Sequence, residues 1–180
     1  MNEFMSWIIG IFISFFFLCG LVGSIIIYEE THPKTIVYWD HNNDSDDFRG
    51  GIAWWVLPDI NRPADEHFGE FMISKSLYEA LFSLSIIYSF NKLSHDFILG
   101  EYEEGILIGS GVVEAAEILR KKAGSLSQLF YDWHCSEQIK PERIAYRIKV
   151  DANDLRRELF ALADFMSEAA LKNYAVELWL

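Results

Sequence analysis

A long uncharged apolar segment near the N-terminus restricts this chain more than any other feature. Residues 6–28, SWIIGIFISFFFLCGLVGSIIIY, contain no charged side chain. A helix rises about 1.5 Å per residue and the hydrocarbon core of a bilayer is about 30 Å thick, so roughly 20 apolar residues span it. Trp7 and Tyr28 lie near the two ends, where amphipathic rings favour the headgroup region. The segment predicts one N-terminal transmembrane helix in a single-pass membrane protein.

The residues around this segment predict that it is retained and not cleaved. A secretory signal begins with basic residues, whereas MNEF carries Glu3 and no Lys or Arg. Basic flanks set the orientation of a span, and the nearest basic residue, Lys34, lies after it. Residues 29–180 also hold a single cysteine, Cys135, which cannot form a disulfide within the domain. Both observations favour a cytoplasmic position for the domain that follows.

Small residues recur at every fourth position of the apolar segment, at Ser6, Gly10 and Ser14. This spacing places them on one face of a helix, where they allow two helices to approach closely. A homodimer through this face is one interpretation. The other is the ordinary composition of membrane helices, which are rich in glycine.

Charge distribution limits the partners of the remaining chain. All 15 Lys and Arg and 26 of the 27 Asp and Glu follow residue 28, because only Glu3 precedes it, and the net charge of the protein is −12. An acidic surface argues against binding nucleic acid or docking on anionic lipid, which both need basic patches. It favours a basic protein partner, or serves solubility. We expect an anchor at 1–28, a linker at 29–34 and one soluble α/β domain at 35–180.

Local patterns predict the elements in the first part of this domain. TIVYW at 35–39 and GIAWWVL at 51–57 have the composition of strands, and we expect them to form a hairpin. Ser76 and Glu79 have the spacing of a capping box, which predicts a helix from about 77 to 90. Its apolar face comprises Leu77, Leu81, Leu84 and Tyr88.

The second half has clearer periodicity. VVEAAEILRKKAG predicts a helix that ends near Gly124, and RIAYRIKV alternates as a half-buried strand does. Asp151 is placed to cap a long helix, and AVELWL predicts a last strand. The apolar stripe of the long helix comprises Leu155, Leu159, Leu162, Met166 and Ala170. Strand, helix and strand at the C-terminus suggest a parallel pair with a right-handed crossover. The expected fold is α/β or α+β, with one sheet and about three packed helices.

Two neighbouring tryptophans are the strongest candidates for partner binding. If Trp54 and Trp55 lie in a strand, one faces the core and the other faces outward. An exposed Trp beside an acidic loop is typical of a protein-contact hot spot, although another element could equally cover it. The candidate partner-binding residues are Trp54, Trp55, Asp44, Asp46 and Asp47.

The acidic loop itself matches a calcium-binding pattern only at its beginning. Asp40, Asn42 and Asp44 occupy positions 1, 3 and 5 of an EF-hand loop, but position 12 is Gly51 where a bidentate Glu is needed. We therefore interpret the loop as solvated and predict no metal site there. Likewise, Gly109 and Gly111 suggest a phosphate loop, but the carboxylate of Glu114 would repel phosphate, so we expect a tight turn that enters a helix.

YDWHCSE is the one segment with residue types suited to catalysis or zinc binding. It contains Asp132, His134 and Cys135, and these could serve a metal cluster or a thiol nucleophile. No CxxC or HExxH accompanies them, and adjacent side chains of a strand point to opposite faces. We favour structural roles and predict no catalytic residue, metal or cofactor, with a small enzyme that uses these residues as the alternative.

Two long segments carry a resemblance to a known class of proteins. LGEYEEGILIGSGVVEAAEILRKKAGSL, followed by IKPERIAYRIKVDANDLRRELFALADFM, is similar in layout to small immunity proteins of bacterial polymorphic-toxin systems. The similarity covers roughly residues 76–180. It implies a non-enzymatic protein that neutralises a toxin through an acidic partner-binding surface. The expected function is thus a membrane-anchored protein-interaction domain, and an accessory subunit of a membrane complex is a further alternative.

Overall fold

The computed structural model describes residues 34–39, 50–59, 66–93, 104–138 and 143–180. The apolar segment 6–28 and the loop that holds Asp44, Asp46 and Asp47 lie outside these ranges. Within them, no helix has both the length and the apolar character that crossing a membrane requires. The chain divides into two compact units, Met1–Val37 with Ser136–Tyr146 and Tyr38–Cys135 with Arg147–Leu180. The second is called the main unit below.

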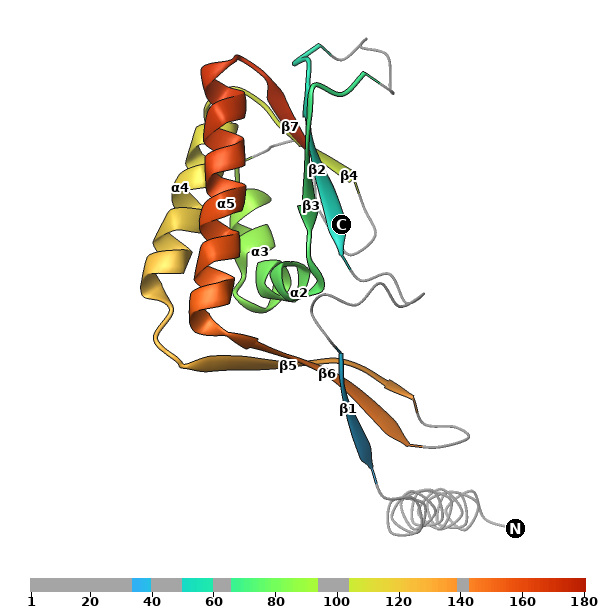
Figure 1. The fold of residues 1–180 in the computed structure, drawn as a ribbon. Coiled ribbons are helices and arrows are strands. Elements are labelled where there is room, and N and C mark those ends of the chain that lie inside the picture. The colour runs from blue at the N-terminus through green and yellow to red at the C-terminus, as the bar shows by residue number, and fades with distance from the viewer. Residues whose placement is uncertain (1–33, 40–49, 60–65, 94–103, 139–142) are drawn as a thin grey trace, which may run out of the picture. The chain divides into compact units, whose positions relative to one another are not determined.

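The main unit contains a four-stranded antiparallel sheet with the strand order β3-β2-β7-β4. All the described helices lie on one face of this sheet (Figure 1). Its strands are β2 (Gly51–Val56), β3 (Gly69–Ile73), β4 (Glu104–Leu107) and β7 (Ala175–Trp179). The described residues therefore form an α+β fold, in which an antiparallel sheet is covered by helices on one side.

A second sheet corrects the expectation of a single one. It has three strands in the order β1-β6-β5, with β1 at Thr35–Trp39, β5 at Phe130–Gln138 and β6 at Ile144–Asp151. The predicted strand at 35–39 is confirmed, but its predicted hairpin with 51–57 is wrong. The backbone N–H of Thr35 donates to the Arg143 carbonyl at 2.9 Å, which ties β1 to the start of β6.

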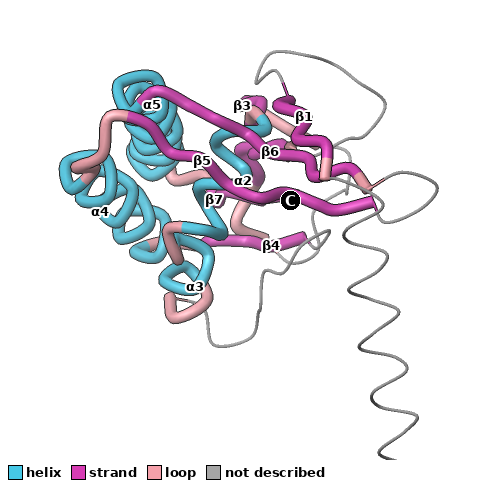
Figure 2. The backbone as a smooth tube through the Cα atoms, turned by 90° about the horizontal axis from the view of Figure 1, so that it is seen from below, coloured by secondary structure: helices cyan, strands magenta, loops and turns pink. Residues whose placement is uncertain are grey.

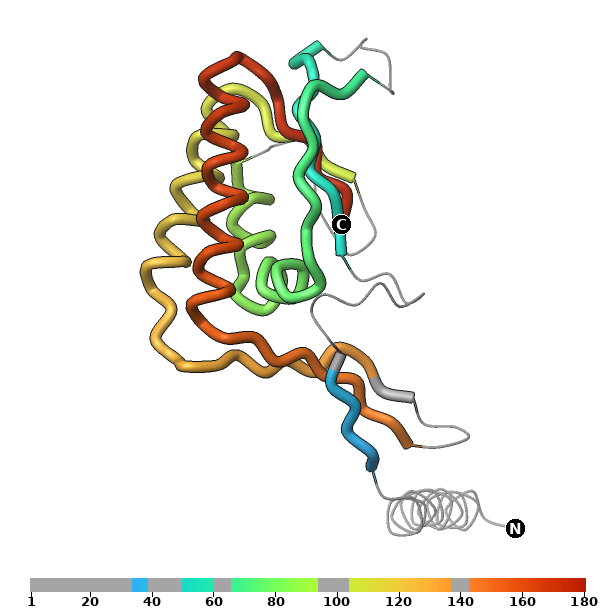
Figure 3. Tube along the Cα trace, viewed as in Figure 1, coloured from blue at the N-terminus to red at the C-terminus, as the bar shows by residue number. Residues whose placement is uncertain are grey.

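The predicted parallel pair at the C-terminus is also wrong. β6 and β7 belong to different sheets, and β7 is antiparallel to both of its neighbours, β2 and β4. Figure 3 shows the last strand of the chain lying among strands from its first two thirds. This arrangement needs long-range pairing, which a local sequence pattern does not specify.

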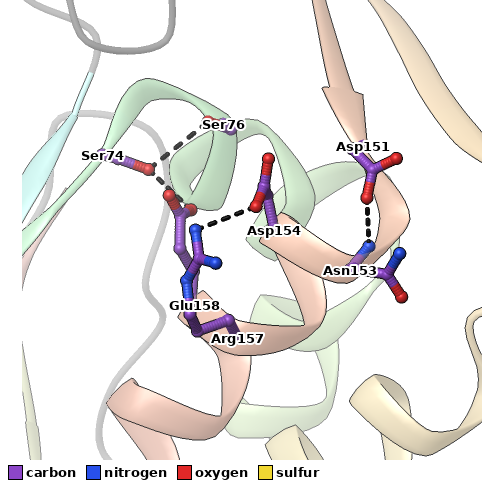
Figure 4. A network of polar contacts seen from close by, with 7 residues as sticks. All are labelled: Ser74, Ser76, Asp151, Asn153, Asp154, Arg157 and Glu158. Carbon is purple, nitrogen blue, oxygen red and sulfur yellow. Dashed lines mark hydrogen bonds and ion pairs between the residues drawn. The ribbon is translucent and has the colours of Figure 1, made fainter.

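Four helices lie in the described ranges: α2 (Lys75–Ser83), α3 (Ile86–Phe90), α4 (Ser110–Ser125) and α5 (Ala152–Leu171). α4 and α5 pack side by side, as Figures 1 and 2 show from two directions. The predicted helix at 112–124 and the long C-terminal helix are both confirmed. Most of the predicted stripe of α5 is fully buried, namely Leu155, Leu159, Leu162 and Met166. The Asp151 carboxylate accepts a hydrogen bond from the Asn153 N–H at 2.7 Å and so caps α5 as predicted (Figure 4).

The helix predicted at 77–90 is divided into α2 and α3. Ser85 adopts a left-handed conformation with φ 58°, and this turn ends the first helix. The break changes the helical phase, so that Tyr88 is 64% exposed and does not continue the buried face of Leu77 and Leu81. The predicted capping box is displaced as well, because Ser74 and not Ser76 caps α2, by accepting from the Leu77 N–H at 3.1 Å.

Ser74 also joins α2 to α5. Its hydroxyl donates to Glu158 Oε2 at 2.8 Å, and the contact is visible in Figure 4. Arg157 and Asp154 form a separate ion pair at 2.9 Å on the same helix. The bond between Ser74 and Glu158 holds the start of α2 against α5 and thereby helps to position β3, which immediately precedes Ser74.

Candidate protein-interaction face

The four-stranded sheet has two chemically different faces. In an antiparallel pair, directly opposed residues share a face, and successive residues alternate between faces. Trp55 lies opposite Gly69 and Val176, on the face that the helices cover. Trp54 lies opposite Glu70 and Glu177, on the other face. The two tryptophans therefore face opposite sides of the sheet, as predicted, and Trp54 is half-buried.

Trp55 is a core residue and is only 8% exposed. Its ring stacks on Phe165 with centroids 5.0 Å apart, and its Nε1–H donates to the Phe165 carbonyl at 3.2 Å. Tyr174 also stacks on Trp55, and the Lys172 ammonium lies 4.5 Å from its ring centroid. Trp55 thus holds the sheet on α5 and does not present a surface to a partner.

The opposite side of the sheet, hereafter the outer face, is part apolar and part acidic. By strand register it consists of Ile52, Trp54, Val56, Glu70, Met72, Glu104, Ile106, Ala175, Glu177 and Trp179, of which Val56 and Ala175 are fully buried. Met72 is 59% exposed and Trp179 is 43% exposed. Large apolar side chains at this level of exposure, gathered on one sheet face, are typical of a surface that contacts another molecule.

An aromatic row crosses the outer face. The rings of Trp54 and His67 are almost parallel, at 8°, with centroids 4.4 Å apart. On its other side Trp54 lies near Trp179, with centroids 6.4 Å apart and planes inclined by 16°. The indole Nε1–H of Trp54 donates to Glu70 Oε2 at 3.2 Å. These contacts hold Trp54 in one orientation, which lowers the entropy that a partner must offset when it binds there.

The charge of the outer face has a single sign. Glu70, Glu104 and Glu177 supply carboxylates, and no Lys or Arg occupies any of the strand positions that form this face. Carboxylates on one surface attract a cationic partner and disfavour an acidic one. The combination of aromatic anchors with carboxylates matches a basic protein surface.

The sequence-predicted Asp132, His134 and Cys135 lie together on β5 but do not face one way. Asp132 and His134 are exposed, whereas Cys135 is half-buried on the opposite side of the strand, where its thiol lies 3.8 Å from the Trp133 carbonyl. Asp132 accepts a hydrogen bond from Arg147 Nε at 2.7 Å and one from the Tyr38 hydroxyl at 3.3 Å. The hydrogen bond to Asp132 raises the pKa of the Arg147 guanidinium above its usual value. Asp132 therefore serves the packing of β1, β5 and β6.

The described ranges contain no candidate metal site, because no three His, Cys, Asp or Glu side chains there form a cluster that could hold a metal ion. The Gly109 turn is confirmed as a tight entry into α4, with φ 57° at Gly109, a conformation that glycine adopts readily.

A shallow hollow of about 480 Å³ lies along the exposed side of α5, lined in part by Arg156, Arg157 and Phe160. Arg157 pairs with Asp154 of the same helix at 2.9 Å, whereas Arg156 contacts the neighbouring helix. Arg156 donates to the carbonyls of Ala123 and Leu126, at 3.1 and 3.2 Å, and so secures the end of α4. All six residues that line the hollow belong to α5.

Comparison with protein-family models, curated proteins and solved structures finds no match to this chain. The resemblance to immunity proteins therefore stays a prediction. Sequence patterns indicated Trp54 but missed Glu70, Glu104, Glu177 and Trp179. These side chains come from separate strands, and only the register between the strands brings them to one face.

Proposed function

We propose that this protein is a membrane-anchored, non-enzymatic interaction protein whose outer face binds a basic protein partner. The observation that carries the proposal is the outer face itself, where the exposed Trp179 and the ordered Trp54 lie among carboxylates. Aromatic residues that are surrounded by polar groups are the usual energetic centres of protein interfaces.

The membrane anchor in this proposal is the uncharged segment 6–28, which has the length and composition of a single span. We place the domain on the cytoplasmic side and keep pairing of the spans through Ser6, Gly10 and Ser14 as part of the proposal. An anchor confines the outer face near the membrane, which raises its effective concentration toward a partner there. A protein toxin that is neutralised as it reaches the membrane is the partner implied by the resemblance to immunity proteins.

Affinity isolation of the full chain from its host membranes tests this function. Trp179→Ala removes an aromatic side chain that is 43% exposed on the outer face, and Phe160→Ala removes one that is 38% exposed on α5. We expect the first change to weaken partner retention by at least about tenfold, as at interface hot spots, and the second to leave it unchanged.

Ionic strength provides a second readout of the same experiment. Retention should fall as salt increases, because the outer-face carboxylates are screened within about 10 Å at 0.1 M salt. Equal retention by the two alanine variants would contradict the proposed role of the outer face. So would retention that salt does not affect.

A further inference from the structure

We propose that the outer face recognises an arginine side chain of the partner, whose guanidinium stacks on Trp179 and pairs with Glu104. This inference rests on the proposed function and specifies the chemistry of the contact. The positions involved are four neighbours on β7 and β4, in which Trp179 lies directly opposite Glu104 and Glu177 directly opposite Ile106. A ring, two carboxylates and an aliphatic side chain are thus adjacent on one surface.

The two sides of Trp179 are not equivalent. β7 lies between β2 and β4, so Trp179 has Ile52 directly opposite it on the β2 side, with Trp54 at the diagonal position there, and Glu104 directly opposite it on the β4 side. Trp54 occupies the first side, with ring centroids 6.4 Å apart. Trp179 nevertheless remains 43% exposed, and Glu104 is exposed beside it. The β4 side is therefore the side on which a planar cation can approach.

Cations already cover aromatic rings elsewhere in the main unit. The Lys172 ammonium lies 4.5 Å from the centroid of Trp55, and that of Lys92 lies 4.1 Å from the centroid of Tyr88. The described strand positions of the outer face contain no Lys or Arg, and in this proposal the partner supplies the cation for Trp179. A second copy of this chain is a poor source, because its own outer face is acidic and its net charge is −12.

Arginine fits the site better than lysine does. A guanidinium is planar, stacks on an indole and pairs with a carboxylate through two parallel hydrogen bonds, whereas an ammonium is a strongly hydrated point charge. The aliphatic part of the arginine side chain can also lie along Ile106, next to the two carboxylates. Stacking and pairing together require the ring and the carboxylate to be neighbours, as Trp179 and Glu104 are.

The test is a titration of the full chain in detergent micelles, labelled with ¹⁵N-tryptophan, followed by NMR. The probes are two hexapeptides of equal charge, which alternate glycine with arginine or with lysine. We expect the indole N–H signals of Trp179 and Trp54 to shift with the arginine peptide, and this peptide to bind about three- to tenfold more tightly than the lysine peptide. Glu104→Gln should remove most of this preference. Glu117→Gln, which removes the same charge from an exposed position on α4, should not.

Equal affinities for the two peptides would overturn the inference, as would an arginine preference that Glu104→Gln leaves intact. Both outcomes are separable from failure of the proposed function. Loss of partner retention in Trp179→Ala, combined with equal peptide affinities, means that the outer face binds a partner without selecting arginine. If Trp179→Ala leaves partner retention unchanged, the proposed function is refuted, whatever the peptide affinities are.

Discussion

Replacing Gly69 by alanine should lower the stability of the sheet that carries the outer face. An added Cβ would lie 2.6 Å from Trp55 Cε3 and 2.7 Å from its Cδ2. Ordinary carbon contacts are about 3.5–4.0 Å, so the indole or the strand must move by about 1 Å. The φ angle of Gly69 is not positive, so the effect comes from packing and not from backbone strain.

Trp55 has little freedom to make this movement. Its Nε1–H is bound to the Phe165 carbonyl at 3.2 Å, and its ring stacks on Phe165 and Tyr174. Overpacking of this kind costs about 1–3 kcal/mol. Because Trp55 is held so firmly, we expect a packing cost in the upper part of this range, about 2–3 kcal/mol. Alanine recovers about 0.5–1 kcal/mol of backbone entropy relative to glycine, so the free energy of unfolding should fall by about 1–2 kcal/mol.

Gly124→Ala is the matched control. Nothing lies within 4 Å of a Cβ added at Gly124, near the end of α4, and alanine there should be neutral or stabilising by up to about 1 kcal/mol. Urea unfolding of the full chain in detergent, followed by tryptophan fluorescence, measures both variants. If Gly69→Ala unfolds within about 0.5 kcal/mol of the unchanged protein, the tight contact between β3 and Trp55 is refuted.

Three further variants and one control variant test the other assignments. Ser74→Ala removes the α2 cap and the bond to Glu158, so it should lower the free energy of unfolding in urea by about 1–2 kcal/mol. Its control, Ser125→Ala at the exposed end of α4, should lower it by less than about 0.5 kcal/mol. Equal losses in the two variants would contradict the role of Ser74 as the cap. Cys135→Ser, together with a metal chelator, should leave partner retention unchanged, and a loss would revive the enzyme alternative. In that background, Leu129→Cys, at a side chain that is 81% exposed, should react with a membrane-impermeant thiol reagent only after cells are permeabilised; labelling of intact cells would place the domain outside.

Local sequence patterns predicted most of the helices and strands because the physical causes are local. The Asp151 cap and the buried stripe of α5 follow from residues within a few turns of one another. The period of two in a strand likewise predicted that Trp54 and Trp55 face opposite ways. The break at Ser85 was missed because apolar residues continue through it, and a single left-handed residue leaves no mark in the hydrophobic pattern.

Strand pairing is where prediction from the sequence failed, and the outer face depends on strand pairing. Nothing local indicates that β1 pairs with β6, or that β7 lies between β2 and β4. Glu70, Glu104 and Trp179 each look like ordinary surface residues along the chain. They become a candidate site only when the register of three strand pairs places them beside Trp54.

The most direct test of the outer face as the partner-binding surface is site-specific photo-crosslinking in host cells. A benzophenone side chain is placed at Met72, which is 59% exposed on the outer face, or at Phe160, which is 38% exposed on α5. We expect a discrete adduct with a basic protein from Met72, absent from Phe160 and lost when Trp179→Ala is added. An adduct from Phe160 and none from Met72 would contradict the account and move the interface to the helices.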